Sequence, residues 1–207
     1  VVDSEALLFQ DSIPDQLTLV GEGYIGVELA TVYAKLGSRV VIVESEKLLP
    51  SNNYVGFSIT QGNVYRRKEW SLNNIIKISN KLLENNKIPV FFIEKENTQL
   101  EKKISQLIPD ALFPEHESSL SGPALVVCLG KRLDFAISID NGIMHMLSLS
   151  KVPMITLFGP TDSEKFAPEY KRSIVLDSKK LYNTKNISSI TVEDVLQAAK
   201  QHLNFSY

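Results

Sequence analysis

The sequence predicts an α/β protein whose main part is a doubly wound parallel sheet, preceded by a partial βαβ unit. From residue 54 onward, short apolar segments alternate with segments of helical spacing. Continuous apolar strands between helices are typical of a parallel sheet covered on both faces. Before that, residues 19–44 place a Gly-x-Gly-x-x-Gly turn between an apolar strand and a helix, and end on a second strand. This order is typical of the start of a dinucleotide-binding fold.

The first part is short. We expect a strand at 17–20, a helix at 25–36 that Gly37 closes as its C-cap, and a strand at 39–44. Only nine residues, 45–53, separate the last strand from the next apolar run. A crossover to a parallel neighbour takes about a dozen residues or more, so the doubly wound pattern breaks here. The sequence therefore predicts two domains, 1–50 and 54–207.

The second part alternates regularly between the two kinds of element. Its expected strands are 54–60, 89–94, 111–113, 135–140, 153–159 and 173–177. Its expected helices are 72–85, 98–107, 122–131, 143–150 and 191–203. Trp70 and Phe113 are expected in the core, and His116 in a surface loop.

Composition excludes several classes of function. The net charge of −2 favours neither nucleic acid nor an anionic membrane as a partner. No apolar run approaches the roughly 20 residues of a transmembrane helix, and the start lacks a basic signal head, so we expect a cytoplasmic protein. The single cysteine, Cys128, excludes an internal disulfide and is expected to be a buried structural thiol. No residue spacing indicates a metal site.

The glycine turn indicates a phosphate site. Gly21, Gly23 and Gly26 have the spacing that lets a backbone approach a pyrophosphate at a helix N-terminus. Glu44 is placed to accept hydrogen bonds from a ribose 2′-hydroxyl, which favours NAD over NADP. The alternative is a turn without a ligand, because two strands and one helix cannot form a full cofactor cleft.

Residues 1–50 resemble the opening of the NAD-binding domain of dihydrolipoyl dehydrogenases. The resemblance implies NAD as a cofactor at the three glycines, with Glu28 near the nicotinamide side and Glu44 at the adenosine ribose. The FAD domain and the redox-active cysteine pair of that family are missing from this sequence. With Cys128 alone, dithiol–disulfide chemistry is excluded.

A second candidate site lies in the larger part. Asp140 ends an expected strand, Asn141 and Gly142 form the turn, and His145 lies on the first turn of the next helix. Ligands of open α/β sheets bind beyond the carboxyl ends of strands, where helix amides can hold a diphosphate. Thr161, in the GPT turn one βα unit later, is expected to face the same crevice. The alternative is an ordinary strand-end turn.

The motifs DNGIMH and LFGPT, with RRKEW at 66–70 and SSL at 118–120, resemble the ADP-heptose:lipopolysaccharide heptosyltransferases of glycosyltransferase family 9. The match runs from about 54 to the end and corresponds to their C-terminal, nucleotide-sugar-binding half of a GT-B fold. It implies Asp140, Gly142 and His145 at the donor diphosphate and sugar, and Lys68 on the phosphates. Thr60 is implied nearby, and Glu94 or Glu96 at the ribose. Asn141 stands where the family often has Ser or Thr.

This resemblance implies an inverting transfer without a metal or other cofactor, from an ADP-heptose type donor to a lipopolysaccharide-core acceptor. The family's general base comes from its N-terminal acceptor domain, which we expect to be missing, so no catalytic residue is assigned and we expect an incomplete transferase. Asp140, beside the donor diphosphate, is on the wrong side of the cleft to act as that base. Two alternatives stay open. One is an NAD-binding fragment of a dehydrogenase-like flavoprotein; the other is a non-catalytic chimera whose first strands join the main sheet.

Overall fold

The computed structural model describes residues 7, 11–20, 24–43, 53–61, 68–118 and 122–203. The chain forms two compact units, Val1–Pro50 and Ser51–Tyr207. Among the described residues, none of the helices has the length and apolar character needed to cross a bilayer.

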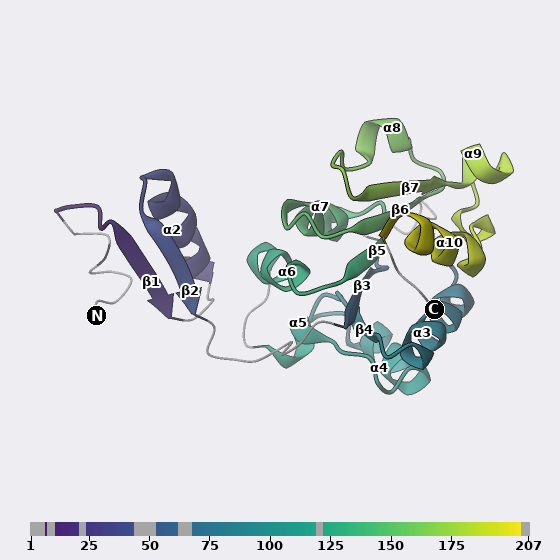
Figure 1. The fold of residues 1–207 in the computed structure, drawn as a ribbon. Coiled ribbons are helices and arrows are strands. Elements are labelled where there is room, and N and C mark those ends of the chain that lie inside the picture. Colours follow the sequence, from purple (N-terminus) through teal and green to yellow (C-terminus); the bar gives the residue numbers. More distant parts are fainter. Residues whose placement is uncertain are drawn as a thin grey trace. The chain divides into compact units, whose positions relative to one another are not determined.

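The first unit is a parallel strand pair with one helix, coloured purple in Figure 1. It consists of β1 (Gln16–Val20), α2 (Tyr24–Lys35) and β2 (Arg39–Val43), and the strands pair from Gln16↔Arg39 to Val20↔Val43. A small core forms around Leu7, Leu17, Leu29 and Tyr33.

The helix α2 ends as the sequence predicts. Gly37 has a φ of +98°, which an L side chain rarely adopts. The amide of Ser38 donates to the Tyr33 carbonyl oxygen at 2.9 Å, and that of Gly37 to Ala34 at 3.2 Å. These two bonds form a Schellman motif, in which glycine lets the chain turn back.

The second unit is built on a five-stranded parallel sheet with the order β4-β3-β5-β6-β7. Its strands are β3 (Tyr54–Ser58), β4 (Ile88–Phe91), β5 (Phe135–Ile139), β6 (Met154–Phe158) and β7 (Ser173–Asp177). The doubly wound parallel α/β fold is thus confirmed. In the described part, β1 and β2 pair with each other as a two-stranded sheet.

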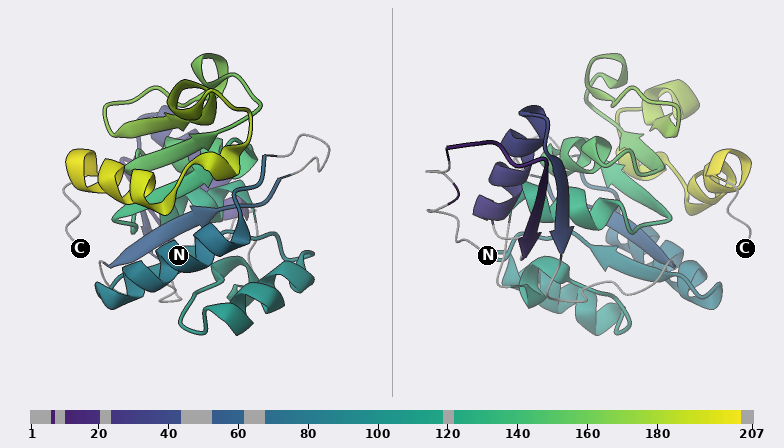
Figure 2. Two further views of the ribbon diagram at one scale, coloured as in Figure 1. Left: turned by 90° about the vertical axis from the view of Figure 1, so that its right-hand side faces the viewer. Right: turned by 60° about the vertical axis from the view of Figure 1, so that its left-hand side comes forward.

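Helices cover both faces of this sheet. Figures 1 and 2 show α3 and α10 on one face and α6 and α7 on the other. The helices are α3 (Leu72–Glu84), α4 (Thr98–Leu107), α5 (Pro114–Glu117), α6 (Pro123–Gly130), α7 (Gly142–Leu149), α8 (Ser163–Phe166), α9 (Ser178–Tyr182) and α10 (Val192–Leu203), with a 3₁₀ turn, η2 (Ile187–Ser189). Continuous burial along β3, β5 and β6 explains their uninterrupted apolar sequences.

The core contains both aromatic residues that the sequence places there. Trp70 is 3% exposed and Phe113 is 5% exposed. The indole N–H of Trp70 donates to the Ile190 carbonyl oxygen at 2.8 Å, so the buried polar atom is satisfied.

Several local expectations need correction. The expected strand 111–113 is only an isolated bridge between Leu112 and Val90. His116 lies in α5 and is half-buried, not in a surface loop. Cys128 is half-buried, because α6 turns its Leu125–Val126–Leu129 face into the core. The short helices α5, α8 and α9 escaped prediction, since a single turn carries no periodicity.

Candidate functional site

The candidate site lies where the strand order of the larger sheet reverses. From β3 the chain moves outward to β4, and then returns to place β5 on the other side of β3. The loops that leave β3 and β5 therefore diverge at their carboxyl ends, which is where open α/β sheets bind ligands. Thr60 and Lys68 follow β3, and Asp140 to His145 follow β5. The topology thus brings both predicted segments to one edge of the sheet.

A buried ion pair joins these two segments. The Lys68 ammonium donates to Asp140 Oδ2 at 2.5 Å and to the Asp140 carbonyl oxygen at 3.1 Å. Their side chains are only 11% and 9% exposed. The positively charged Lys68 ammonium group is therefore held at the carboxyl edge of the sheet. The Asp140 carboxylate is its partner in the ion pair.

The helix α7 begins directly after this pair. Its N-cap is Asn141, whose side chain accepts a hydrogen bond from the Met144 amide at 2.9 Å. The backbone amides of Gly142 and Ile143, which lie between Asn141 and Met144, belong to the first turn of α7 and have no partner within the helix. A Cβ built on Gly142 would meet no atom within 4 Å. Open space thus lies beside the positive end of this helix.

The remaining predicted residues surround this position. His145 is exposed on the first turn of α7. Thr60 Oγ1 donates to Glu94 Oε1 at 3.3 Å, which links the exit of β3 to the exit of β4. The carbonyl oxygen of Thr161, after β6, accepts from Lys179 Nζ at 2.5 Å, while its buried hydroxyl has no partner. Direct contacts thus join Thr60, Lys68, Asp140 and Asn141, whereas Thr161 follows the adjacent strand.

Sequence reasoning missed an acidic group beside Glu94. Glu115, in α5, is 6% exposed, and one of its carboxylate oxygens has no partner. The pKa of Glu115 is raised to about 7, first by burial and then by the carboxylates of Glu94 and Glu96, against a lowering by Lys95. No periodic or motif signal marks Glu115, because its burial depends on tertiary packing.

In the first unit the predicted NAD site is described only in part. Gly26 is half-buried in α2, and Glu28 is exposed on the same helix. The predictions for Gly21, Gly23 and Glu44 lie outside the described residues.

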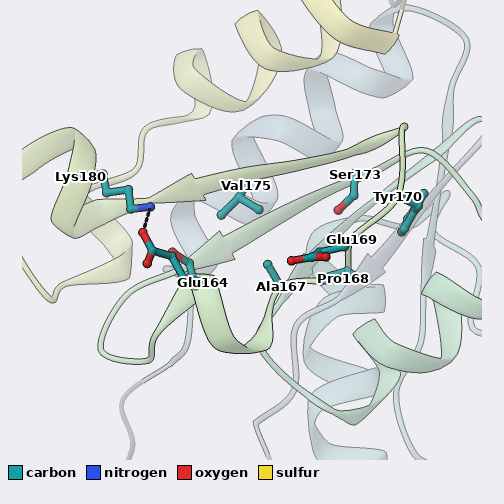
Figure 3. A pocket seen from close by; sticks show the side chains of 9 residues that line it. Glu164, Ala167, Pro168, Glu169, Tyr170, Ser173, Val175 and Lys180 are labelled. Carbon is teal, nitrogen blue, oxygen red and sulfur yellow. Dashed lines mark hydrogen bonds and ion pairs between the residues drawn. The ribbon is translucent and has the colours of Figure 1, made fainter.

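A surface pocket lies elsewhere, at the edge strand β7. It has a volume of about 300 Å³ and is lined by β7, α8, the segment between them and Lys180 of α9 (Figure 3), but by none of the predicted site residues. An exposed ion pair between Glu164 and Lys180, 2.9 Å apart, lies at its rim. Over the described ranges, no group of three or more His, Cys, Asp or Glu side chains is arranged to hold a metal ion.

Known proteins resemble the two units separately. The family model for pyridine nucleotide-disulphide oxidoreductases matches residues 1–55. Over 52 residues the chain is 54% identical to dihydrolipoyl dehydrogenase 3 of Haloarcula marismortui, a match that covers 25% of this chain and 11% of that protein.

The chain also resembles solved glycosyltransferases in its fold. A glycosyltransferase family 9 protein from Veillonella parvula superposes with a TM-score of 0.62 at 20% identity, over 75% of this chain and 47% of that one. The E. coli heptosyltransferase WaaC with ADP gives 0.61 at 16% identity, over 87% and 57%. The chain thus spans about half the length of these proteins.

At identities of 16–20%, the solved structures show only that the fold is shared. Membership of a family is shown by the match to a family model. It matches residues 43–196, which include the whole sheet and every residue of the carboxyl-edge site. By that match the chain belongs to glycosyltransferase family 9, the heptosyltransferases.

Proposed function

We propose that the larger unit binds the diphosphate of a nucleotide sugar at the carboxyl edge between β3 and β5. Family membership supports this class of ligand, since the fold is shared with a heptosyltransferase whose structure contains ADP. An ADP-heptose type donor is the specific ligand that we propose.

The observation that carries the proposal is the convergence of two positive groups. Lys68 presents a buried ammonium, and the first turn of α7 presents unpaired amides, directly after β5. Helix N-termini and lysine ammonium groups both favour phosphate oxygens. Gly142 leaves space at this point, so a phosphate can approach the amides closely.

The same geometry suggests how a leaving diphosphate is stabilised. Charge that develops on the diphosphate as the glycosidic bond breaks would lie against Lys68 and the α7 amides. His145 is exposed on the same turn and can donate a further hydrogen bond. Asp140 is unsuited to be the general base, because its carboxylate is occupied by Lys68. No residue of this chain is assigned as the base that activates the acceptor.

Titration with ADP tests the proposal. We expect the wild-type protein to bind ADP saturably, as measured by calorimetry. The ADP affinity of Lys68→Met should be at least about tenfold lower, because a charge-assisted contact to phosphate is worth about 1.5–3 kcal/mol. Lys87→Met is the matched control, since Lys87 also pairs with an aspartate at 2.5 Å, that of Asp134, before β4 and β5 begin. Absence of saturable binding at millimolar ADP, or equal losses in the two variants, would contradict the proposal.

A second candidate function is NAD binding by the first unit. It is supported by the 54% identity to a dihydrolipoyl dehydrogenase over 52 residues. We expect NAD to shift the amide resonances of Gly21 to Gly26, and Glu44→Ala to weaken this binding. If NAD leaves those resonances unmoved, this candidate fails and the nucleotide-sugar proposal is unaffected.

A further inference from the structure

The side chain of Asn141 connects three segments at the carboxyl edge. Its Oδ1 accepts from the Met144 amide at 2.9 Å and so caps α7. Its Nδ2 donates to Ser58 Oγ at 2.7 Å and to the Thr60 carbonyl oxygen at 2.8 Å. The amide group is thus fully engaged within the protein, and is not offered to a ligand.

These bonds fix one end of the loop that carries Lys68. Ser58 is the last residue of β3, and Thr60 lies two positions further on, in the loop that leads to Lys68. The other end of that loop is fixed by the bond from Lys68 to Asp140. Two adjacent residues, Asp140 and Asn141, therefore hold both ends of the loop against the start of α7.

Capping alone does not need an asparagine. A serine hydroxyl caps a helix about as well, but it has one hydrogen to donate and a shorter reach. It cannot replace the two bonds that cross from α7 to β3. The cap and the cross-link can therefore be separated by one substitution.

We propose that Asn141 is a positioning residue for the diphosphate: its amide sets the distance between the β3 exit and the α7 amides, so that Lys68 and those amides contact one diphosphate together. This inference rests on the proposed nucleotide-sugar function. It assigns Asn141 an indirect role, whereas Lys68 and the amides of Gly142 and Ile143 make the contacts.

The test compares ADP with AMP on the complete chain. A second phosphate can gain from Lys68 and the α7 amides together only when their spacing is right. The ratio of the AMP Kd to the ADP Kd therefore reports the alignment. In Asn141→Ser we expect this ratio to fall about tenfold, with AMP affinity little changed. A purely structural role would weaken both ligands equally and leave the ratio unchanged, which would overturn the inference.

The control is Asn97→Ser at the start of α4. Asn97 caps that helix by accepting from the Leu100 amide at 3.4 Å. It should leave both affinities and their ratio unaltered. Fluorescence of Trp70, the sole tryptophan, checks that each variant is folded. If Asn141→Ser unfolds, Ser58→Ala removes one of the two acceptors and should lower the ratio by a smaller factor; an unchanged ratio there overturns the inference.

The wild-type titration separates the two claims. If wild-type protein binds ADP and the ratio survives Asn141→Ser, the positioning role is wrong and the proposed function stands. If wild-type protein does not bind ADP, the proposed function fails, and the inference fails with it.

Discussion

Replacing Asp140 by asparagine removes the negative charge from the buried ion pair with Lys68, which joins the segments that follow β3 and β5. The ammonium of Lys68 would keep its bond to the Asp140 carbonyl oxygen but would lose its counter-charge at 2.5 Å. Breaking a buried pair by removing one partner costs about 3–5 kcal/mol. Because a neutral amide oxygen still accepts a hydrogen bond, we expect a loss of about 2–3 kcal/mol in the free energy of unfolding.

The assay is thermal unfolding followed by the fluorescence of Trp70, which is buried in the larger unit and therefore reports that unit. For a unit of this size, each kcal/mol lowers Tm by about 2–4 °C, so a decrease of roughly 4–12 °C is expected. The matched control is Asp134→Asn. Its pair with Lys87 has the same 2.5 Å distance, but its side chains are 22% and 30% exposed. A more exposed pair should cost less than about 1 kcal/mol.

ADP provides the second half of this test. A bound diphosphate supplies Lys68 with a new counter-charge, so saturating ADP should raise the Tm of Asp140→Asn more than that of the wild type. Equal destabilisation by Asp140→Asn and Asp134→Asn would refute the argument that burial makes the Lys68 pair special. An equal ADP-induced shift in wild type and variant would refute the argument that the diphosphate replaces the carboxylate.

Three further predictions concern other parts of the chain. The raised pKa of Glu115 means that the folded state binds its proton more tightly than the unfolded state, so this group's contribution to stability is lost as pH rises from about 4.5 to about 7. Glu115→Gln should remove a fall on the order of 3 kcal/mol between pH 4.5 and 8, measured by urea unfolding; an unchanged pH dependence would show that the carboxyl is not buried. Gly142→Ala should leave Tm nearly unchanged, since its Cβ meets no atom within 4 Å, while weakening ADP several-fold by filling the space at the α7 amides; unaltered affinity would place the phosphate elsewhere. Tyr33→Phe removes the hydrogen bond from the Tyr33 hydroxyl to the Leu7 carbonyl oxygen at 2.8 Å. It should lower the stability of the first unit by about 1 kcal/mol, measured by hydrogen exchange, while the unfolding of the larger unit followed by Trp70 fluorescence stays unchanged.

Elements with a strong local pattern could be predicted from sequence. The helix α4 and the strand β7 have the expected bounds, 98–107 and 173–177. The C-cap at Gly37 also followed from local chemistry, since the residue needs a positive φ. The parallel sheet followed from apolar strands that are buried on both faces.

Long-range pairings could not be predicted in the same way. Lys68 and Asp140 lie 72 positions apart, and nothing in either neighbourhood indicates that they bond. Resemblance placed both residues at one site, but not the ion pair between them. The same holds for Asn141. In the sequence this asparagine indicates only a turn, whereas its hydrogen bonds to Ser58 and Thr60 depend on β3 lying beside β5. The environment of Glu115 is likewise a product of packing.

The most direct measurement of the central claim is a heteronuclear NMR titration of the complete chain with ADP. If a diphosphate binds at the start of α7, the amide resonances of Gly142 and Ile143 shift saturably, and together with those near Lys68. Shifts confined to the β7 pocket, or no shift at Gly142 and Ile143 at millimolar ADP, would contradict the account.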